Sequence, residues 1–324
     1  MDRILITGGG GFIGSHLARE LYRQGNFVRI ADVKFNSYMK DKHYNEKLRL
    51  DLRVFGNCIA TTEGIDMVYN LAANMGGIGF ITTVGAEVMH DNVIINANML
   101  EASKQNKIKR YLFSSSACVY PTFRQTDPDV NGLKEDDAYP ADPDNFYGWE
   151  KLYVEKMCEA YQRDYGMDIR ILRYHNIYGP EGTYKGGREK SPAALCRKIA
   201  EAENPGTVEI WGDGKQTRSY CYVDDAVTGT IKLMQSNYGK PINIGSERLV
   251  TIDRLADIII GISGKRITKT HNLSAPQGVR GRNADITLAR KKLEWEPRIT
   301  LEAGLEKTYE WTEMRCTEDI KERG

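Results

Sequence analysis

The sequence predicts an α/β protein in which a doubly wound parallel sheet is joined to a smaller, interleaved C-terminal domain. Short apolar runs with the length of buried strands recur through the first half of the chain. Segments with helical spacing of apolar residues precede the later runs, and a glycine-rich turn connects the first run to the first helix. Strands that alternate with helices in this way are typical of a parallel sheet covered on both faces.

The elements follow one another regularly up to about residue 173. A strand at 4–6, a helix at 15–24 and a second strand at 27–30 predict a βαβ unit. The further apolar runs predict strands at 67–71, 110–114 and 169–173.

Beyond residue 173 the pattern loosens into loops rich in Gly and Lys. A helix is expected near 192–201, a late strand of the sheet at 242–244, and a polar, frayed tail from about Glu313. The chain has no internal repeat and no low-complexity linker, which indicates two interleaved domains that line one cleft. We expect a dinucleotide-binding domain of residues 1–172 plus about 222–247, and a substrate domain of about 173–221 plus 248–324.

Composition bounds the function classes. The 324 residues, 41% hydrophobic and 27% charged, suffice for one large core or two smaller ones. The formal net charge is +1, so no overall field favours nucleic acid or an anionic membrane surface. Neither is expected as a partner, and anion binding must be local.

Targeting and metal signals are not found. The start MDRILITGGGGFIG enters a strand directly, and no apolar run approaches the roughly 20 residues that a membrane span needs. The six cysteines are scattered without zinc or disulfide spacing, and the five histidines make no convincing metal set. These observations predict a cytoplasmic protein without a metal.

The glycine-rich turn carries the first functional signal. Gly8, Gly11 and Gly14 form a GxxGxxG turn between strand and helix, where backbone N–H groups and the helix N-terminus can hold a pyrophosphate. Asp32 closes the second strand, where a carboxylate can accept hydrogen bonds from both ribose hydroxyls and would repel a 2′-phosphate. The pair favours NAD over NADP as the cofactor.

The second signal is the YxxxK pair Tyr147 and Lys151. Their i, i+4 spacing places phenol and ammonium on one helix face, and a nearby ammonium lowers the pKa of a phenol. Tyr147 is therefore expected to act as a base near neutral pH. Together with Ser116, at the end of a predicted strand, the pair forms the Ser-Tyr-Lys set of hydride-transfer chemistry at a sugar or alcohol carbon.

These motifs resemble the extended short-chain dehydrogenase/reductase superfamily of nucleotide-sugar epimerases and dehydratases. The resemblance covers TGGGGFIGSHL, the AD at 31–32, DLR at 51–53, NLAA at 70–73, RYHNIYGP at 173–180 and RSYCYVDD at 218–225. It implies a Rossmann fold with NAD as cofactor. The residues that it implies for NAD are Gly8, Gly11, Phe12, Ile13, Gly14, Asp32, Asp51, Leu52, Leu71, Ala72, Ala73, Tyr147 and Lys151.

Cys118 distinguishes between the reactions of this superfamily. In the 4,6-dehydratases of this superfamily an Asp-Glu pair follows the catalytic Ser or Thr, whereas this chain has Ala117 and Cys118 there. Together with SSSACVYP, the segments AANMGGIGFI, GTYKGGREKSPAALCRK, WGDGKQTRSY and QGVRGRN are similar to the GDP-mannose 3,5-epimerases. The chain departs from that family at Asn74, Tyr184 and Ser191, where the family has Asp, Trp and Ala.

The resemblance implies epimerisation of GDP-D-mannose at C3 and C5 to GDP-L-galactose, with GDP-L-gulose as the product of C5 inversion alone. Transient oxidation at C4 acidifies both neighbouring carbons, Cys118 would act as base and Lys190 as acid, and C4 is then reduced again. A thiol is a base as the thiolate, so cationic side chains are expected beside Cys118. The residues implied for the GDP-sugar are Gly76, Ser116, Ala117, Cys118, Asn176, Glu189, Lys190, Gln216, Thr217 and Arg218. Arg282 could bind the diphosphate by its planar fork, with Lys198 and Arg218 as further candidates.

Two other functions stay open at this point. The chain could be another epimerase or a 4-ketosugar-forming enzyme that acts on a UDP- or dTDP-sugar, or a non-catalytic NAD-binding scaffold. Base specificity rests on resemblance alone. Helices near 91–105 and 147–165 carry apolar residues at helical spacing, and in related enzymes the equivalent pair forms a four-helix dimer interface, so a homodimer is expected.

Overall fold

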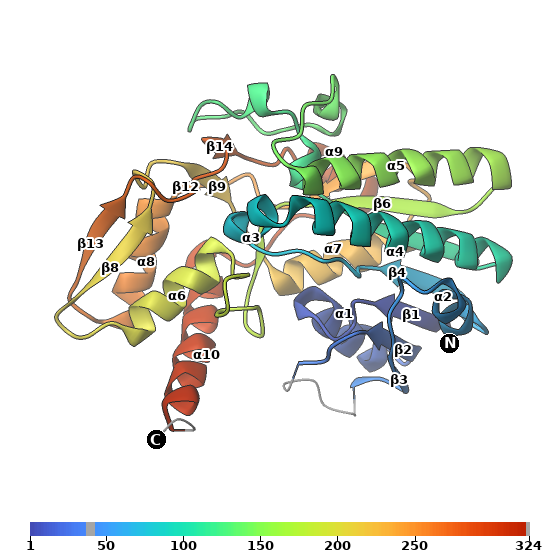
Figure 1. The fold of residues 1–324 in the computed structure, drawn as a ribbon, viewed down its shortest axis with the longest axis horizontal. Helices are drawn as coiled ribbons and strands as arrows, with labels where there is room; N and C mark the ends of the chain where they lie inside the picture. Colours follow the sequence, from blue (N-terminus) through green and yellow to red (C-terminus); the bar gives the residue numbers. More distant parts are fainter. Residues whose placement is uncertain (37–42, 322–324) are drawn as a thin grey trace.

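The computed structural model describes residues 1–36 and 43–321. A seven-stranded sheet with all its pairings parallel forms the centre, in the order β11-β6-β5-β4-β1-β2-β3 (Figure 1). The doubly wound parallel sheet expected from the sequence is thereby confirmed. Its strands are β1 (Arg3–Thr7), β2 (Phe27–Asp32), β3 (Glu46–Arg49), β4 (Met67–Asn70), β5 (Arg110–Ser116), β6 (Ile169–Tyr174) and β11 (Pro241–Ile244).

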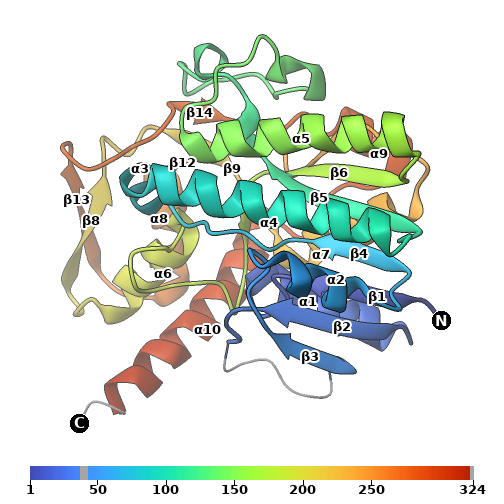
Figure 2. The same ribbon diagram turned by 45° about the vertical axis from the view of Figure 1, so that its right-hand side comes forward.

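Helices cover both faces of this sheet (Figures 1 and 2). In β1 the side chains of Ile4 and Ile6 enter the core on one face, whereas Leu5 enters the core on the other, as the two-residue period of a strand requires. The helices on the first face are α1 (Phe12–Arg23), α7 (Val223–Gln235) and α9 (Thr287–Leu293), and those on the second are α2 (Phe55–Thr62), α4 (Gly85–Gln105) and α5 (Phe146–Tyr165).

Strand order reverses between β1 and β4, since β2 lies on one side of β1 and β4 on the other. A crevice at the carboxyl ends of the strands on either side of such a switch point is where open α/β sheets bind their ligands. The glycine turn follows β1, Leu71 follows β4, and Ser116 ends β5. The fold therefore brings the expected cofactor and catalytic residues to one edge of the sheet.

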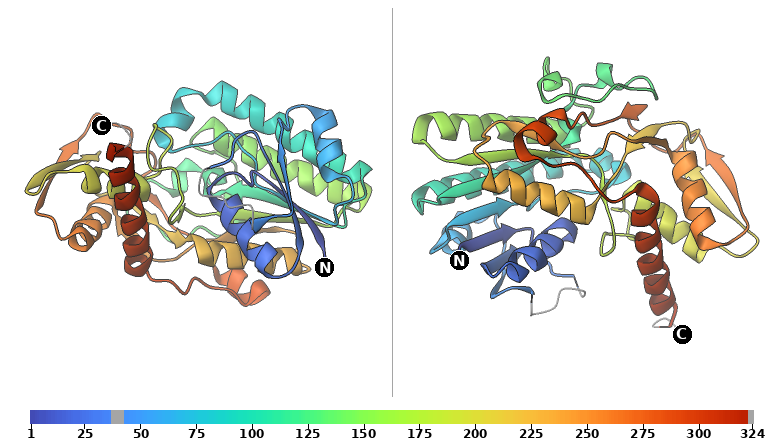
Figure 3. Two further views of the ribbon diagram at one scale, coloured as in Figure 1. Left: turned by 90° about the horizontal axis from the view of Figure 1, so that it is seen from below. Right: turned by 180° about the vertical axis from the view of Figure 1, so that it is seen from behind.

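A smaller lobe adjoins that edge, and Figure 3 shows it from two further sides. Three helices and three small sheets compose it. The helices are α6 (Ser191–Glu201), α8 (Ile252–Ser263) and α10 (Leu301–Lys321), and the sheets pair β8 (Gly206–Trp211) with β13 (Ile267–Asn272), β9 (Thr217–Ser219) with β12 (Leu249–Thr251) and β14 (Gly281–Arg282), and β7 (Ile177–Tyr178) with β10 (Cys221–Tyr222). The short helices are α3 (Ile78–Thr83), η2 (Ala117–Val119), η3 (Thr122–Arg124) and η4 (Glu135–Ala138).

The expectation of a frayed C-terminal tail from Glu313 is wrong, because α10 continues to Lys321. Leu305, Thr308, Thr312 and Cys316 are buried at a spacing of three or four residues. Such a narrow stripe suffices to pack a helix whose overall composition is polar, and α10 packs against α6 and α8. The domain boundaries expected from the sequence stay a prediction.

Candidate functional site

The glycine turn packs closely against the protein backbone around it. Gly8 has a φ of 68°, and a Cβ there would lie 2.9 Å from the Ala72 nitrogen. A Cβ on Gly14 would lie 2.2 Å from the Gly8 carbonyl oxygen, so the turn and α1 pack as tightly as glycine permits. The first turn of α1 has Gly11 as its N-cap and no side-chain cap, which leaves N–H groups for an anion.

Asp32 stands at the end of β2, beside this turn. Its carboxylate accepts hydrogen bonds from the N–H groups of Gly10 at 3.0 Å and Lys34 at 3.1 Å. Burial raises the pKa of Asp32, and these hydrogen bonds oppose the rise. The glycine cradle, the uncapped helix terminus and this carboxylate together fit a pyrophosphate and a ribose with free hydroxyls.

Four of the other expected cofactor residues have defined surroundings in the structure, and their contact with a cofactor stays a prediction. The N–H groups of Leu71 and Ala72 bond the Thr7 hydroxyl at 3.1 and 3.2 Å, which ties the ends of β1 and β4 together. Leu52 is buried, and the carboxylate of Asp51 pairs with Arg53. Arg53 lowers the pKa of Asp51 by this hydrogen bond.

Ser116, Tyr147 and Lys151 meet where β5 ends against the start of α5. The ammonium of Lys151 lies 5.4 Å from the centroid of the Tyr147 ring. Burial raises the pKa of Tyr147 well above its ordinary value, the charges of Cys118 and Glu150 raise it further, and a hydrogen bond with Ser116 opposes them. The surrounding protein thus raises the pKa of Tyr147, whereas the nearby Lys151 ammonium was expected to lower it. The role of Tyr147 as a base near neutral pH stays a prediction.

Lys151 is itself buried beside a carboxylate of the same helix. Burial lowers the pKa of its ammonium, and the carboxylate of Glu150, 3.9 Å away, opposes that effect. Glu150 is itself fully buried and accepts a hydrogen bond from Asn96 at 2.8 Å, and burial raises its pKa. Among the charges that act on Lys151, the carboxylate of Glu150 does most to favour the ammonium form.

Cys118 lies in η2, directly after Ser116. Its N–H donates to the Ser116 hydroxyl at 3.1 Å, which caps this short helix. The guanidinium of Arg282 donates from Nη1 to the Cys118 sulfur at 3.3 Å. Arg282 is thus a cationic side chain beside the thiol, as was expected from the sequence.

Lys190 reaches the site because two distant segments pack together. The N–H of Gly77 bonds the Arg188 carbonyl at 3.0 Å, and a Cβ on Gly77 would lie 2.3 Å from the carbonyl oxygen of Glu189. Lys190 follows at the start of α6, with its side chain open to the cavity. The surrounding protein lowers the pKa of its ammonium, while Cys118 raises it and Arg282 lowers it.

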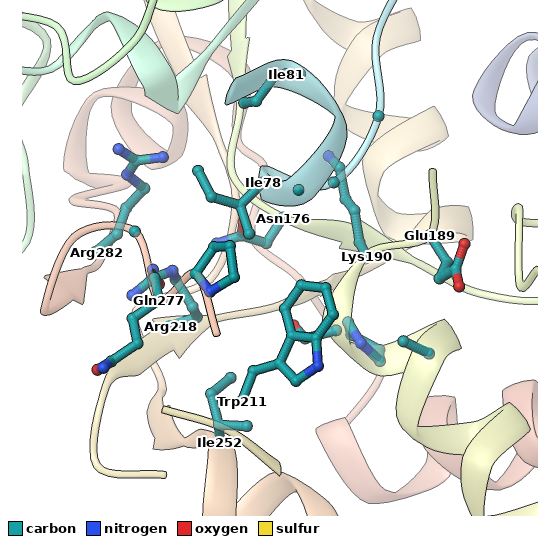
Figure 4. Close-up of a pocket in the computed structure, with 18 of the residues that line it drawn as sticks. Ile78, Ile81, Asn176, Glu189, Lys190, Trp211, Arg218, Ile252, Gln277 and Arg282 are labelled. Carbon is teal, nitrogen blue, oxygen red and sulfur yellow. Dashed lines mark hydrogen bonds between the residues drawn. The ribbon is translucent and has the colours of Figure 1, made fainter. Parts of the chain in front are cut away.

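A cavity of about 340 Å³ joins these groups. Arg282 and Lys190 enter it from opposite sides, with Ile78 and Asn176 between them (Figure 4). Such a volume suits a small organic ligand. The expected substrate residues that line it are Gly76, Ser116, Ala117, Cys118, Asn176, Glu189, Lys190, Lys198, Gln216, Arg218 and Arg282.

Thr217 does not line the cavity, in contrast to the other expected substrate residues. It lies in β9, where successive side chains point to opposite faces, and its hydroxyl donates to the Pro128 carbonyl instead. Gln216, Arg218 and Tyr220 share the face that meets the cavity. The two-residue period of the segment would have excluded Thr217 and identified Tyr220.

The sequence analysis missed the apolar and aromatic part of the wall. The exposed indole of Trp211 lines the cavity (Figure 4). A hydrogen bond from its Nε1 to the carboxylate of Glu209 at 3.0 Å holds it. Lys198 bonds the carbonyl of Glu209 at 2.9 Å. Burial, followed by the charge of Arg282, lowers the pKa of Arg218 to about 10, so Arg218 remains a cation at neutral pH.

The three positions at which the chain departs from the resembled family all have partners. Asn74 accepts a hydrogen bond from Arg188 at 3.0 Å and donates to two carboxylates, which an Asp could not do. The Tyr184 hydroxyl donates to Asp319 at 2.8 Å. The Ser191 and Tyr220 hydroxyls are hydrogen-bonded at 2.8 Å.

Other site chemistries find little support. Residues 1–36 and 43–321 contain no group of three or more His, Cys, Asp and Glu side chains that could hold a metal ion. All six cysteines are free. In the same part of the chain, none of the helices has the length and apolar character needed to cross a membrane.

Comparisons with known proteins show the family of this chain. The family model described as "NAD dependent epimerase/dehydratase family" matches residues 4–245. GDP-mannose 3,5-epimerase 1 of Oryza sativa subsp. japonica is 47% identical over 310 residues, which are 95% of this chain and 81% of that protein. GDP-mannose 3,5-epimerase of Arabidopsis thaliana is 46% identical over the same shares.

Solved structures extend the similarity to the whole fold. UDP-glucose 4-epimerase of Thermotoga maritima, solved with UDP-glucose, has a TM-score of 0.86 and 29% identity and covers 97% of this chain and 99% of its own. UDP-glucuronic acid 4-epimerase of Bacillus cereus, solved with UDP-glucuronic acid and NAD, has a TM-score of 0.84 and 28% identity over 96% of this chain and 99% of its own.

Proposed function

We propose that this chain, which belongs to the NAD dependent epimerase/dehydratase family, inverts C3 and C5 of GDP-D-mannose. The product is GDP-L-galactose, and C5 inversion alone yields GDP-L-gulose. The similarity to two plant GDP-mannose 3,5-epimerases supports the substrate. The observation that carries the proposal is the pairing of Cys118 with Arg282 on one side of the cavity and Lys190 on the other.

Ser116, Tyr147 and Lys151 act at C4 of the sugar. Tyr147 removes the proton of the C4 hydroxyl, Ser116 hydrogen-bonds the phenol, and Lys151 stabilises the negative charge that develops on it. The glycine turn and Asp32 would hold NAD⁺, which would supply a hydride acceptor and donor for C4 and a positive charge that favours the tyrosinate form of Tyr147. No net oxidation occurs in this cycle.

Cys118 and Lys190 act at the neighbouring carbons. A ketone at C4 acidifies the protons on C3 and C5, and inversion requires a base on one face of the ring and an acid on the other. The Cys118 thiolate takes the proton and the Lys190 ammonium donates one from the opposite side. Arg282 stabilises the thiolate by its hydrogen bond to the sulfur.

The remaining wall would hold the nucleotide. Arg218 is cationic at neutral pH and lines the cavity beside Gln216, whose buried Oε1 has no hydrogen-bond partner in the described part of the chain. A ligand N–H or O–H would satisfy this acceptor. Lys198 and the indole of Trp211 line the cavity as well. The assignment of Arg282 to the diphosphate stays a prediction, because its donors already bond Gln125, Cys118 and Asp144.

The test is incubation of the purified protein with GDP-mannose in D₂O, followed by NMR of the sugar protons. Loss of the C3 and C5 signals with appearance of GDP-L-galactose supports the proposal. If only UDP- or dTDP-sugars turn over, the C4 chemistry stands and the substrate assignment falls. If no nucleotide sugar reacts, the catalytic proposal is wrong and a non-catalytic NAD-binding scaffold becomes the leading alternative.

We also propose a homodimer through α4 and α5, which pack side by side (Figure 2). Phe146, Trp149 and Tyr153 of α5 are exposed at a spacing of three and four residues, so they lie along one face of the helix. A contiguous exposed aromatic face marks an interaction surface. A twofold axis beside α5 would bury it against its copy.

A further inference from the structure

Gln125 is a fully hydrogen-bonded side chain next to the cavity to which sequence analysis gave no role. It follows η3 and is 1% exposed. Its Nε2 donates to the carbonyls of Tyr120 at 3.0 Å and Pro121 at 3.1 Å. Because both amide hydrogens are committed to these carbonyls, the direction of the remaining atom, Oε1, is set.

Oε1 of Gln125 faces Arg282. It accepts a hydrogen bond from Arg282 Nε at 2.5 Å, across 157 positions of sequence. The backbone carbonyl of Gln125 also accepts hydrogen bonds from the N–H groups of Arg280 at 3.0 Å and Gly281 at 3.2 Å. Gln125 therefore ties the segment that follows Cys118 to β14, which carries Arg282.

The planar guanidinium transmits this constraint to Cys118. Fixing Nε fixes the plane of the fork, so the direction of Nη1, which donates to the Cys118 sulfur at 3.3 Å, is set as well. The third nitrogen, Nη2, lies 3.5 Å from Asp144 Oδ1. Arg282 is 7% exposed, so few alternative orientations are open to it.

Several charged or titratable groups face Cys118 from other elements. They are Tyr147 and Lys151 of α5, Arg218 of β9 and Lys190 before α6, while Asp144 faces it through Arg282. Among the side chains that the structure describes, Arg282 alone donates a hydrogen bond to the sulfur. Its orientation therefore has the most direct effect on the thiolate.

We propose that Gln125 is a positioning residue for proton transfer at Cys118: it holds the fork of Arg282 so that Nη1 points at the sulfur. The inference deepens the proposed epimerisation and rests on the catalytic role given there to Cys118. Arg282 donates both hydrogen bonds to side chains of this same chain, Gln125 and Cys118, so the arrangement can be tested without a nucleotide sugar.

The experiment measures how fast iodoacetamide alkylates Cys118 as a function of pH, with the modified residue located by mass spectrometry. Gln125→Met should slow the reaction near neutral pH roughly tenfold or more and move the rate curve to higher pH, because the reactive species is the thiolate. Gln125→Asn should act in the same direction, since the shorter amide cannot reach both the carbonyls and Arg282. The other five cysteines are buried, which keeps the readout specific.

Gln162→Met is the matched control. Gln162 also donates to two carbonyls, those of Ile169 and Gly239, both at 3.0 Å, but has no contact with Arg282. This variant should lose comparable stability and leave the alkylation rate unchanged. Thermal unfolding of every variant separates loss of fold from loss of positioning.

A double variant decides whether Gln125 acts through Arg282. In the background of Arg282→Gln, Gln125→Met should cause no further change in alkylation. Folded Gln125 variants that are alkylated at the wild-type rate, or effects that add in the double variant, overturn the proposal. Alkylation needs no nucleotide sugar, so failure on GDP-mannose would refute the proposed function and leave this result standing.

Discussion

Gly148, in the first turn of α5, lies directly against the carbonyl oxygen of Cys118. A Cβ on Gly148 would be 2.1 Å from that oxygen and 2.9 Å from Cβ of Pro143. This contact holds Tyr147, the residue before Gly148, and Cys118 in one wall of the cavity. Gly148 thus fixes the separation between Tyr147, the proposed base at C4, and Cys118, the proposed base at C3 and C5.

Gly148→Ala is therefore expected to push η2 away from α5. The clash is with backbone, which yields little, so we expect a loss of about 1–3 kcal/mol in the free energy of unfolding, together with a fall in kcat. Denaturant unfolding and turnover measure the two effects. Gly56→Ala, in α2 with nothing within 4 Å of the added Cβ, is the matched control and should gain about 0.5–1 kcal/mol. Equal stability of the two variants would contradict the packing argument.

Cys118→Ala should separate the two parts of the proposed reaction. Deuterium exchange at C3 and C5 should fall by roughly 10²-fold or more, because the base is removed, while oxidation at C4 continues. NMR in D₂O reports exchange, and nicotinamide absorbance on mixing with substrate reports the C4 step. Cys316→Ala, on α10 and outside the cavity lining, is the control. Unimpaired epimerisation by Cys118→Ala would remove Cys118 from the mechanism.

Lys190 should set the alkaline limit of the rate. The surrounding protein lowers the pKa of its ammonium, so the acid loses its proton at a lower pH than a free lysine does. Epimerisation should fall as pH rises through that lowered pKa, and Lys190→Met should reduce the rate at all pH values by roughly 10²-fold. Lys185→Met, in the same loop but paired with Asp319, should keep the wild-type profile. An unchanged profile in Lys190→Met would assign the acid elsewhere.

Asp32 should govern the choice of dinucleotide. Asp32→Ala should weaken NAD binding roughly tenfold, because two charge-assisted hydrogen bonds to the ribose are lost. It should also reduce the ratio of the affinity for NAD to the affinity for NADP, because the carboxylate no longer repels a 2′-phosphate. Isothermal titration with each dinucleotide measures this without turnover. Since the carboxylate also bonds the N–H groups of Gly10 and Lys34, Asp32→Asn serves as the variant that keeps an acceptor. Wild-type NAD affinity in Asp32→Ala would exclude the ribose role.

Trp149→Glu tests the dimer. A carboxylate on the exposed aromatic face of α5 should prevent burial of that face, so light scattering should give the mass of one chain for the variant and twice that mass for the wild type. Phe123→Glu changes an equally prominent aromatic side chain outside α5 and should leave the mass unchanged. A wild-type protein with the mass of one chain would refute the dimer.

The sequence by itself determined the features that depend on the spacing of residues within one short segment. Apolar runs predicted six strands, and all six are present. The glycine turn from Gly8 to Gly14 and the end of β2 at Asp32 are also present. The i, i+4 spacing placed Tyr147 and Lys151 on one helix. A period of two residues in a strand, or of three to four in a helix, is a property of one short segment. It can therefore be recognised without knowing which distant segments pack against it. The same periods also indicate that Thr217 points away from the cavity and that the C-terminal tail is helical, two features that were not predicted.

The tertiary structure alone decided which distant groups meet and what charge they prefer. Gln125 reaches Arg282 across 157 positions and Arg282 reaches Cys118 across 164, and no local pattern encodes either contact. Lys190 arrives through the contact of Gly77 with Glu189. The pKa of Tyr147 rises because burial and nearby charges outweigh the hydrogen bond of Ser116. Burial depends on every element packed around a group, so it is a property of the whole fold rather than of the segment that carries the residue.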